Sequence, residues 1–297
     1  MEYISTRGSA PVLGFADALL AGLARDGGLY APLTIPRWTP DSIRALRGLS
    51  YANAAVRVMA DFVGGDFAPA ELEAMTADAY SGFRHAATAP LAQIGPNLFS
   101  LELFHGPTLA FKDFAMQWLA RAMDRILAER GERATILGAT SGDTGAAAIE
   151  AFAGRRRADV TILFPLGRVS EVQRRQMTTV DTPNVRALAI EGTFDDCQRI
   201  VKTLFGDLRL RDELRLSGVN SINWARILAQ IVYYFVAAVA LGAPERAVSF
   251  AVPTGNFGDI LAGYYAKRMG LTIERLIIAT NENDILARTL ASGRYEP

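Results

Sequence analysis

The stretch "ATILGATSGDTGAAAIEAFAG", residues 134–154, decides the fold class of this chain. Its first half is an apolar run, and its second half repeats alanine and larger apolar residues with helical spacing. A strand, a glycine-rich turn and a helix therefore follow one another directly. The same order recurs from about residue 97 onward. The sequence thus predicts an α/β fold of open parallel sheets flanked by helices.

Two kinds of pattern divide the chain. Beyond residue 97, strands are expected at 134–140, 158–165, 184–192, 247–253 and 274–281, and helices at 114–130, 144–154, 169–179, 193–205, 221–242 and 259–270. Before it, helical patterns joined by loops occupy 14–28, 39–50, 50–64 and 68–80. We expect Gly27 and Gly28 to end the first helix and Asp41 or Ser42 to cap the second.

These patterns suggest three parts. A mostly helical segment is expected over residues 1–95, a small α/β domain over 96–190, and part of a larger α/β domain over 191–297. The total of 297 residues is enough for one large domain or two ordinary ones.

Composition argues against several classes of partner. The chain is 50% apolar and 21% charged, with a formal net charge of +0, which does not favour nucleic acid or a membrane surface. The apolar run at 231–241 is too short to cross a bilayer, and the first ten residues do not resemble a signal peptide. A single cysteine allows no internal disulfide, so we expect a cytoplasmic setting.

Two glycine-rich loops stand between an apolar run and a helix start, at residues 138–148 and 252–263. Helix N-termini offer free N–H groups, and glycine lets a ligand approach the backbone, so each loop could hold a phosphate or a carboxylate. A tight turn without a ligand is the alternative for either loop alone. Asp143 is a negative group in the first loop, so that loop is expected to meet amines or hydroxyls as well as a carboxylate.

The sequence gives little support for other kinds of functional site, such as nucleotide-binding, hydrolase or metal sites. The chain lacks GxGxxG, GK[ST] and GxSxG motifs. Its two histidines, His85 and His105, cannot build a usual zinc site, and no metal is expected. Cys197 is interpreted as a half-buried helix residue.

Lysine is rare in this chain. It occurs at Lys112, Lys202 and Lys267, and the other 28 basic residues are arginine. Lys202 and Lys267 fall at ordinary solvated helix positions. Lys112 instead opens an amphipathic helix, where the helix dipole disfavours a cation by up to about 1 kcal/mol. It is either a nucleophile kept uncharged by its surroundings or a lysine that extends to solvent beside Asp113, and spacing alone leaves both open.

Several stretches together resemble the threonine synthase family of fold-type II (tryptophan synthase β-like) pyridoxal-phosphate enzymes. They are "YISTRG", "DGGLYAP", "FHGPTLAFKDF", "GATSGDTGAAA", "GTFDDCQ", "NSINWARILAQIVYYF", "VPTGNFGDILAGYYAKRMGL" and "ATNENDIL". The motif around Lys112 and the "TGNFGD" loop are specific signals. Asp143 departs from many relatives, which have asparagine there.

The resemblance implies a role for each matched residue. Lys112 would be the catalytic lysine that forms the internal aldimine with pyridoxal 5'-phosphate. The residues that match the cofactor-phosphate loop are Gly255, Asn256, Phe257, Gly258 and Asp259. Those that match the loop facing the substrate carboxylate and the edge of the cofactor ring are Thr140, Ser141, Asp143 and Thr144.

The implied reaction converts O-phospho-L-homoserine and water to L-threonine and phosphate, in a cytoplasmic monomer or homodimer. The family is expected to be longer by a hundred residues or more, with the Ser or Thr beside the pyridine nitrogen beyond residue 297. We therefore expect a C-terminally truncated member. A related phospholyase, or an inactive fragment of the synthase, remains the alternative.

Overall fold

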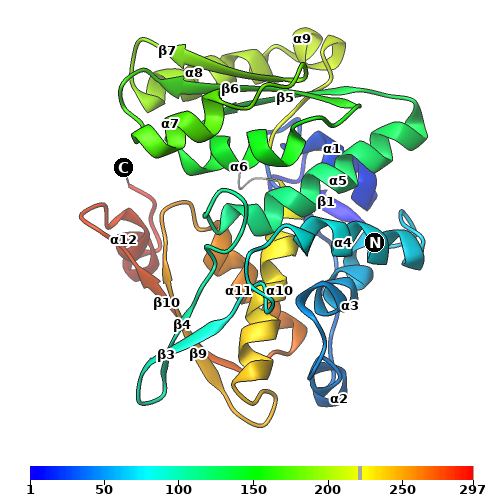
Figure 1. Cartoon of the computed structure of the whole chain (residues 1–297), viewed down its shortest axis with the longest axis vertical. Coiled ribbons are helices and arrows are strands. Elements are labelled where there is room, and N and C mark those ends of the chain that lie inside the picture. Colours follow the sequence, from blue (N-terminus) through cyan, green and yellow to red (C-terminus); the bar gives the residue numbers. More distant parts are fainter. Residues whose placement is uncertain (220–222, 297) are drawn as a thin grey trace.

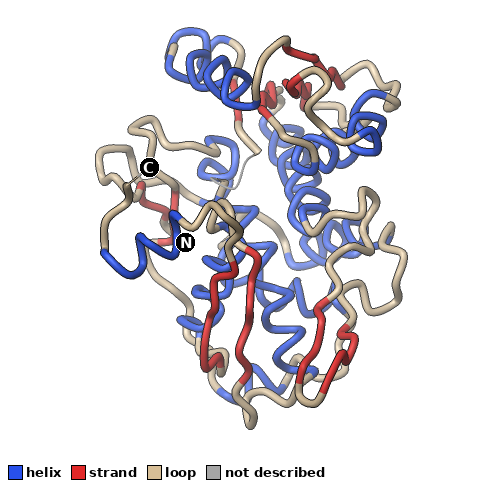
Figure 2. The backbone as a smooth tube through the Cα atoms, turned by 90° about the vertical axis from the view of Figure 1, so that its left-hand side faces the viewer, coloured by secondary structure: helices blue, strands red, loops and turns tan. Residues whose placement is uncertain are grey.

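The structure is a computed structural model, and it describes residues 1–219 and 223–296. Two lobes are stacked along the long axis (Figure 1). The upper lobe holds a four-stranded sheet with its helices. The lower lobe is built around two long helices and short pairs of strands, which lie apart from the four-stranded sheet in Figure 2. The expected α/β class with parallel sheets is confirmed.

The strands are β1 (Tyr3–Ser5), β2 (Tyr30–Pro32), β3 (Leu91–Gly95), β4 (Leu98–Leu101), β5 (Ala134–Ala139), β6 (Ala158–Pro165), β7 (Val185–Ile190), β8 (Leu216–Ser217), β9 (Val248–Pro253) and β10 (Ile273–Ala279). The four-stranded sheet has the order β7-β6-β5-β8, and all its neighbours are parallel. β9 and β10 form a second parallel pair, whereas β1–β2 and β3–β4 are antiparallel.

The helices are α1 (Phe15–Ala21), α2 (Pro40–Arg44), α3 (Tyr51–Val63), α4 (Pro69–Ser81), α5 (Lys112–Arg130), α6 (Asp143–Phe152), α7 (Glu171–Thr178), α8 (Phe194–Gly206), α9 (Leu208–Glu213), α10 (Trp224–Ala240), α11 (Gly258–Met269) and α12 (Ile285–Ser292). Both α5 and α10 are buried along most of their length, and they form the centre of the main core. No helix within the described ranges is long and apolar enough to cross a membrane.

The N-terminal predictions need two corrections. The first helix ends at Gly22 and not at Gly27. Gly22 has a φ of 62°, and a Cβ there would lie 2.8 Å from the backbone oxygen of Gly218, so the chain turns where only glycine fits. The cap of α2 is Thr39, whose hydroxyl accepts a hydrogen bond from the Ser42 amide.

The short strands β1, β2, β3 and β4 were not predicted from the sequence. β1, β2 and β3 lie in the part of the chain expected to hold helices and loops, and β4 lies just beyond it, where no strand was predicted before residue 134. The helix expected at 221–242 begins at Trp224, and residues 221 and 222 lie outside the described residues. The three-part division of the chain stays a prediction. Since β8 pairs with β5, such a division would place residues 216–217 with the four-stranded sheet.

Candidate active site

Lys112 lies at the N-terminus of its helix, as expected, but α5 begins at Lys112 itself, two residues before the predicted start at residue 114. Its side chain is 18% exposed, and its Nζ lies 4.5 Å from the centre of the Phe111 ring. The Nζ also donates a hydrogen bond of 3.2 Å to Oδ2 of Asp143, at the start of α6. The lysine is therefore held between two helix N-termini, inside the protein and not extended to solvent.

Burial lowers the pKa of Lys112 below its ordinary value. The Asp143 carboxylate opposes this shift because it stabilises the charged amine, while the cation of Arg226 lowers the pKa further and Asp259 raises it. The balance favours loss of the proton that a nucleophilic lysine must release.

Asp113 does not pair with Lys112, so the solvent-facing alternative is not what the structure shows. Its buried carboxylate accepts hydrogen bonds from the Thr108 amide at 2.8 Å and from the Thr108 hydroxyl at 2.6 Å. Burial raises the pKa of Asp113 despite these bonds. These hydrogen bonds let Asp113 stabilise the turn before α5, and they so fix the position of Lys112 at the start of that helix.

The loop at 140–144 joins the end of β5 to the start of α6, as predicted. Thr140 is buried, and its hydroxyl accepts hydrogen bonds from the amides of Gly142 and Gly145 at 3.0 and 2.9 Å. Gly142 has a φ of 149°, and a Cβ there would lie 2.2 Å from the Gln173 amide oxygen. Thr140 thus shapes the loop, while Ser141 and Thr144 present accessible side chains.

The second predicted loop joins β9 to α11. Gly255 and Asn256 are exposed, and Phe257 adopts a left-handed φ of 63° directly before the helix. The free N–H groups at the start of α11 face the same space as Lys112, since both border one cleft. This arrangement suits a phosphate group.

Asp259, in the first turn of α11, points toward α10. It accepts hydrogen bonds from the hydroxyls of Tyr233 at 2.6 Å and Tyr234 at 2.9 Å. Burial raises the pKa of Asp259, and the two tyrosine hydrogen bonds oppose that shift. The carboxylate therefore anchors the loop to α10, and its predicted contact with the cofactor stays a prediction.

All three features line one cleft of about 960 Å³ between the lobes. Every predicted site residue borders it: Lys112, Thr140, Ser141, Asp143, Thr144, Gly255, Asn256, Phe257, Gly258 and Asp259. Five cationic side chains also line it, those of Arg25, Lys112, Lys202, Arg211 and Arg226, against the two carboxylates of Asp143 and Asp259. The cleft is thus basic in a chain with a net charge of +0, so it favours a polyanionic ligand.

The sequence analysis missed Arg226 and Gln230 of α10 as site residues. Both are 3% exposed and line the cleft. Arg226 donates through Nη1 to the Val219 carbonyl at 3.1 Å, but its Nε and the Gln230 Oε1 lack a partner among the residues described. Burial lowers the pKa of Arg226 to about 10. Their spacing, one helical turn apart in an otherwise apolar and aromatic helix, was the signal available in the sequence.

Lys202 and Gln198 of α8 also line the cleft. Lys202 is exposed on its helix, as expected, and it borders the same space as Lys112. Lys267 fits the expectation, since it is exposed and donates to the Glu274 carbonyl at 3.0 Å.

The remaining candidates lie apart from this chemistry. His105 contacts Glu102 at 2.8 Å and stacks near His85, with ring centres 5.0 Å apart. No metal-binding cluster of His, Cys, Asp and Glu occurs among the residues with described positions. Cys197 lies in α8 as expected but is fully buried and not half-buried, because it packs in a small core with Leu137 and Val201.

Comparison with known proteins gives a consistent result. The family model for the threonine synthase N terminus matches residues 2–80, and the model for pyridoxal-phosphate dependent enzymes matches residues 85–297. A threonine synthase of Pseudomonas aeruginosa is 58% identical over 296 residues, which are 100% of this chain and 63% of the relative.

Two solved structures extend the comparison. The pyridoxal-phosphate-bound threonine synthase of Brucella melitensis superimposes with a TM-score of 0.95 at 68% identity, covering 100% of this chain and 64% of that one. The Escherichia coli threonine synthase gives a TM-score of 0.89 at 38% identity, covering 100% of this chain and 68% of that one. This chain thus spans a little under two thirds of the length of the Pseudomonas aeruginosa and Brucella melitensis proteins. It belongs to the threonine synthase family of pyridoxal-phosphate dependent enzymes.

Proposed function

We propose that this chain carries the lysine and both anion-binding loops of a threonine synthase, which converts O-phospho-L-homoserine and water to L-threonine and phosphate. One observation carries the proposal: Lys112, the loop at 140–144 and the loop at 254–258 border a single basic cleft. A phosphorylated cofactor and a phosphorylated amino acid bring several negative charges, which match the excess of cations there.

The residues present fit pyridoxal 5'-phosphate. The helix start behind Gly255, Asn256, Phe257 and Gly258 would hold its phosphate, and Lys112 would bond to its aldehyde. The buried Nε of Arg226 offers a further donor in the same cleft without a protein partner among the described residues. When bound, the cofactor supplies an electron sink for carbanion chemistry at the amino acid.

The chain's own groups would orient the substrate and move its protons. The loop of Ser141, Asp143 and Thr144 would grip the amino acid carboxylate, and Thr140 would hold that loop in shape. Lys112 Nζ would take and return protons at Cα and Cβ, since burial lowers its pKa and so makes the uncharged, basic form of the amine easier to reach. Phosphate leaves from Cγ, and water adds at Cβ.

Arg226 would hold an anionic group of the substrate at the floor of the cleft. Its guanidinium is buried without an acidic partner in the described part of the chain, and Gln230 places an unpaired oxygen one helical turn away. Such groups are usually satisfied by a ligand or water when the protein does not satisfy them itself.

Product analysis tests the proposal. Any amino acid that the cofactor-loaded chain forms from O-phospho-L-homoserine, even at a low rate, should be L-threonine, released with an equal amount of phosphate. A keto acid with ammonia would indicate the phospholyase alternative instead, and neither product would indicate a non-catalytic chain. We further propose a cytoplasmic monomer or homodimer that acts on a small molecule and not on nucleic acid or a membrane.

A further inference from the structure

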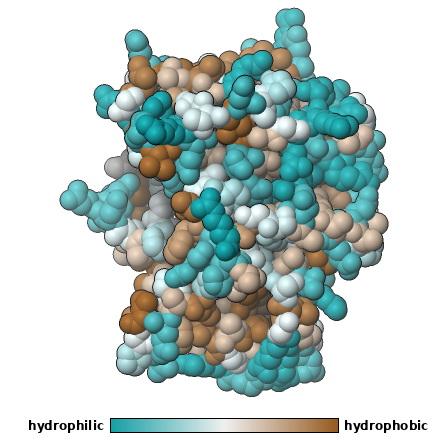
Figure 3. Space-filling model, in the orientation of Figure 1, coloured by the Kyte–Doolittle hydropathy of each residue, from teal (hydrophilic) through white to brown (hydrophobic). Residues whose placement is uncertain are grey.

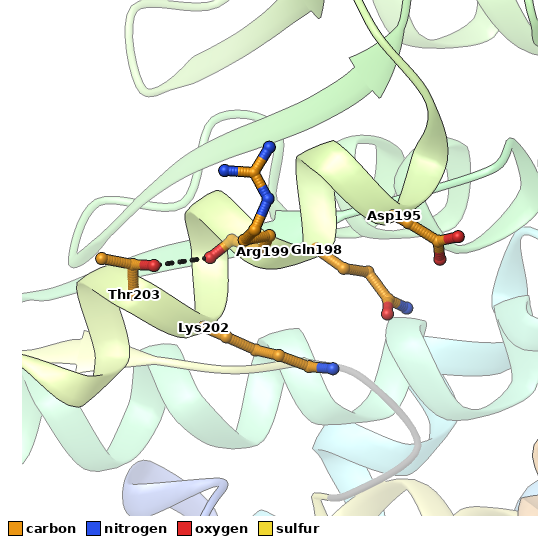
Figure 4. A pocket seen from close by; sticks show the side chains of 5 residues that line it. All are labelled: Asp195, Gln198, Arg199, Lys202 and Thr203. Carbon is orange, nitrogen blue, oxygen red and sulfur yellow. Dashed lines mark hydrogen bonds between the residues drawn. The ribbon is translucent and has the colours of Figure 1, made fainter.

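One wall of the cleft is formed by α8, and it carries two polar side chains on one face. Lys202 and Gln198 lie one helical turn apart, and Figure 4 shows both extending to the same side of the helix while Arg199 points away. The same two residues border the main cleft and an adjoining depression of about 440 Å³, which Asp195, Arg199 and Thr203 also line. They therefore stand where the cleft meets solvent.

Lys202 makes no ion pair with an acid of the described residues, although Asp195 lines the same depression. Within the described residues, no carboxylate lies in ion-pair contact with it, whereas Arg25 pairs with Asp212 and Lys112 pairs with Asp143. On α8 itself, Asp196 is engaged by Arg199 at 2.6 Å. Lys202 thus places a positive charge, without an ion-pair partner among the described residues, at the wall of the cleft.

Lys202 also differs from the other exposed helical lysine of the chain. Lys267 donates to a backbone carbonyl of its own lobe and borders neither the cleft nor the adjoining depression. Lys202 has the amide side chain of Gln198 one helical turn away and borders both the cleft and the adjoining depression. An ammonium on a flexible stem suits a phosphoryl group that must bind and then leave, because it follows the anion as a point charge.

We propose that Lys202, supported by Gln198, binds the phosphoryl group of the ligand at the α8 wall, first as part of the substrate and then as free phosphate. This rests on the proposed function, which supplies a phosphorylated substrate. The other anionic groups have their own candidate partners under the proposed function: the loop at 254–258 for the cofactor phosphate, and the loop at 140–144 with Arg226 for the carboxylate. Lys202 is then a specificity-determining residue that favours a phosphate ester over an uncharged leaving group.

The test is calorimetric titration of inorganic phosphate into the cofactor-loaded chain at constant ionic strength. We expect Lys202→Gln to weaken phosphate binding at least tenfold and Lys202→Arg to retain most of it, because the charge persists. Lys267→Gln is the matched control and should bind phosphate as the parent does. Absorbance of the attached cofactor should be the same in all four proteins, since all of them keep Lys112, the proposed attachment residue.

Three results would overturn the inference: no measurable phosphate binding by the parent chain, binding by Lys202→Gln within twofold of the parent, or an equal loss in Lys267→Gln. The proposed function fails separately. A chain that forms a keto acid and ammonia in place of threonine but loses phosphate binding selectively in Lys202→Gln would contradict the function and keep the binding site. A chain that forms threonine while Lys202→Gln binds phosphate normally would contradict only the role of Lys202.

Discussion

The amine of Lys112 and the carboxylate of Asp143 meet at 3.2 Å, and each belongs to the first residue of a helix. The dipole of α5 disfavours the lysine where it stands, and that of α6 favours the aspartate. Asp143 therefore compensates a cation that is both buried and placed at the unfavourable end of a helix. Because Asp143 also belongs to the loop at 140–144, the lysine and the predicted carboxylate-binding loop are linked before any ligand arrives.

Covalent attachment of the cofactor should occur at Lys112. Borohydride reduction of the cofactor-loaded chain, followed by peptide mapping, should place the label on the peptide that contains this residue. Lys112→Arg should abolish attachment, because a guanidinium does not deprotonate near neutral pH. Lys267→Arg is the matched control and should retain it. A label on Lys202 or Lys267 would contradict the assignment.

Attachment of the cofactor should become faster as the pH rises through the pKa of Lys112, because only the uncharged amine attacks the aldehyde. Asp143 stabilises the charged amine and so raises that pKa, against the larger effect of burial. In Asp143→Asn the midpoint of the rate profile should therefore move to lower pH. Stopped-flow absorbance at a series of pH values measures this midpoint. A midpoint that stays in place or rises would show that Asp143 does not control the lysine.

The loop before α11 can be tested at Gly255, where no atom of the protein lies within 4 Å of an added Cβ. Gly255→Val should therefore fold normally but obstruct access to the helix N-terminus. We expect cofactor affinity to fall at least tenfold, about 1.4 kcal/mol, as measured by fluorescence titration. The same substitution at the exposed Gly65, also free of close neighbours, is the control. Unchanged affinity in Gly255→Val would remove the loop from the phosphate site.

The sequence predicted the elements whose pattern is local. The alternation after residue 134 identifies each strand of the main sheet except β8, and the lysine at the start of α5 follows from spacing. β8 has two residues and exists because β5 offers it an open edge, which no local pattern can reveal. The strands of β1–β2 are likewise held by partners distant in sequence, with Tyr3 opposite Pro32.

The candidate site residues divide in the same way, into those with a local signal in the sequence and those without one. Lys112 and the two loops carry local signals, namely a helix start and glycine-rich turns. Arg226 and Lys202 become site residues only because α10 and α8 fold against the cleft. In sequence, Arg226 resembles any polar residue in a helix and Lys202 any solvated lysine. Arg226 is distinguished by its burial without an acidic partner among the described residues, and Lys202 by its position at the wall of the cleft.

Arg226 should stabilise the complex with the ligand and destabilise the folded state of the ligand-free protein. A buried cation without an acidic partner in the described structure destabilises the folded state, because burial removes its hydration. Arg226→Met should therefore leave the free energy of unfolding unchanged or raise it by about 1 kcal/mol, while weakening binding of O-phospho-L-homoserine at least tenfold. Urea denaturation and ligand titration measure the two quantities. A large loss of stability would instead show that Arg226 is structural.

The lower lobe exposes large apolar side chains, and Figure 3 shows such residues gathered near its end. Ile94 is 64% exposed, Leu98 57% and Ile277 47%. We expect this surface to promote self-association of the chain, because contiguous apolar surface is unfavourable in water. Analytical ultracentrifugation at several concentrations should show species heavier than the monomer, and Leu98→Gln with Ile277→Gln should reduce them. A monomer at all concentrations would contradict this expectation.

Turnover is expected to depend on sequence beyond the matched region. The Pseudomonas aeruginosa relative is longer, since the alignment covers 63% of it. We expect the partner of the pyridine nitrogen to lie in the additional part of that relative. Ligand sites in open α/β sheets form at strand ends contributed by separate parts of a chain, so residues 1–297 should attach the cofactor yet form little threonine. A fusion of this chain to the segment that follows the matched region in that relative should increase the rate of threonine formation at least a hundredfold, on the order of 2.7 kcal/mol in the barrier. The fusion carrying Lys112→Arg is the control and should form none. Equal rates for the chain and the fusion would show that the active site is complete within residues 1–297.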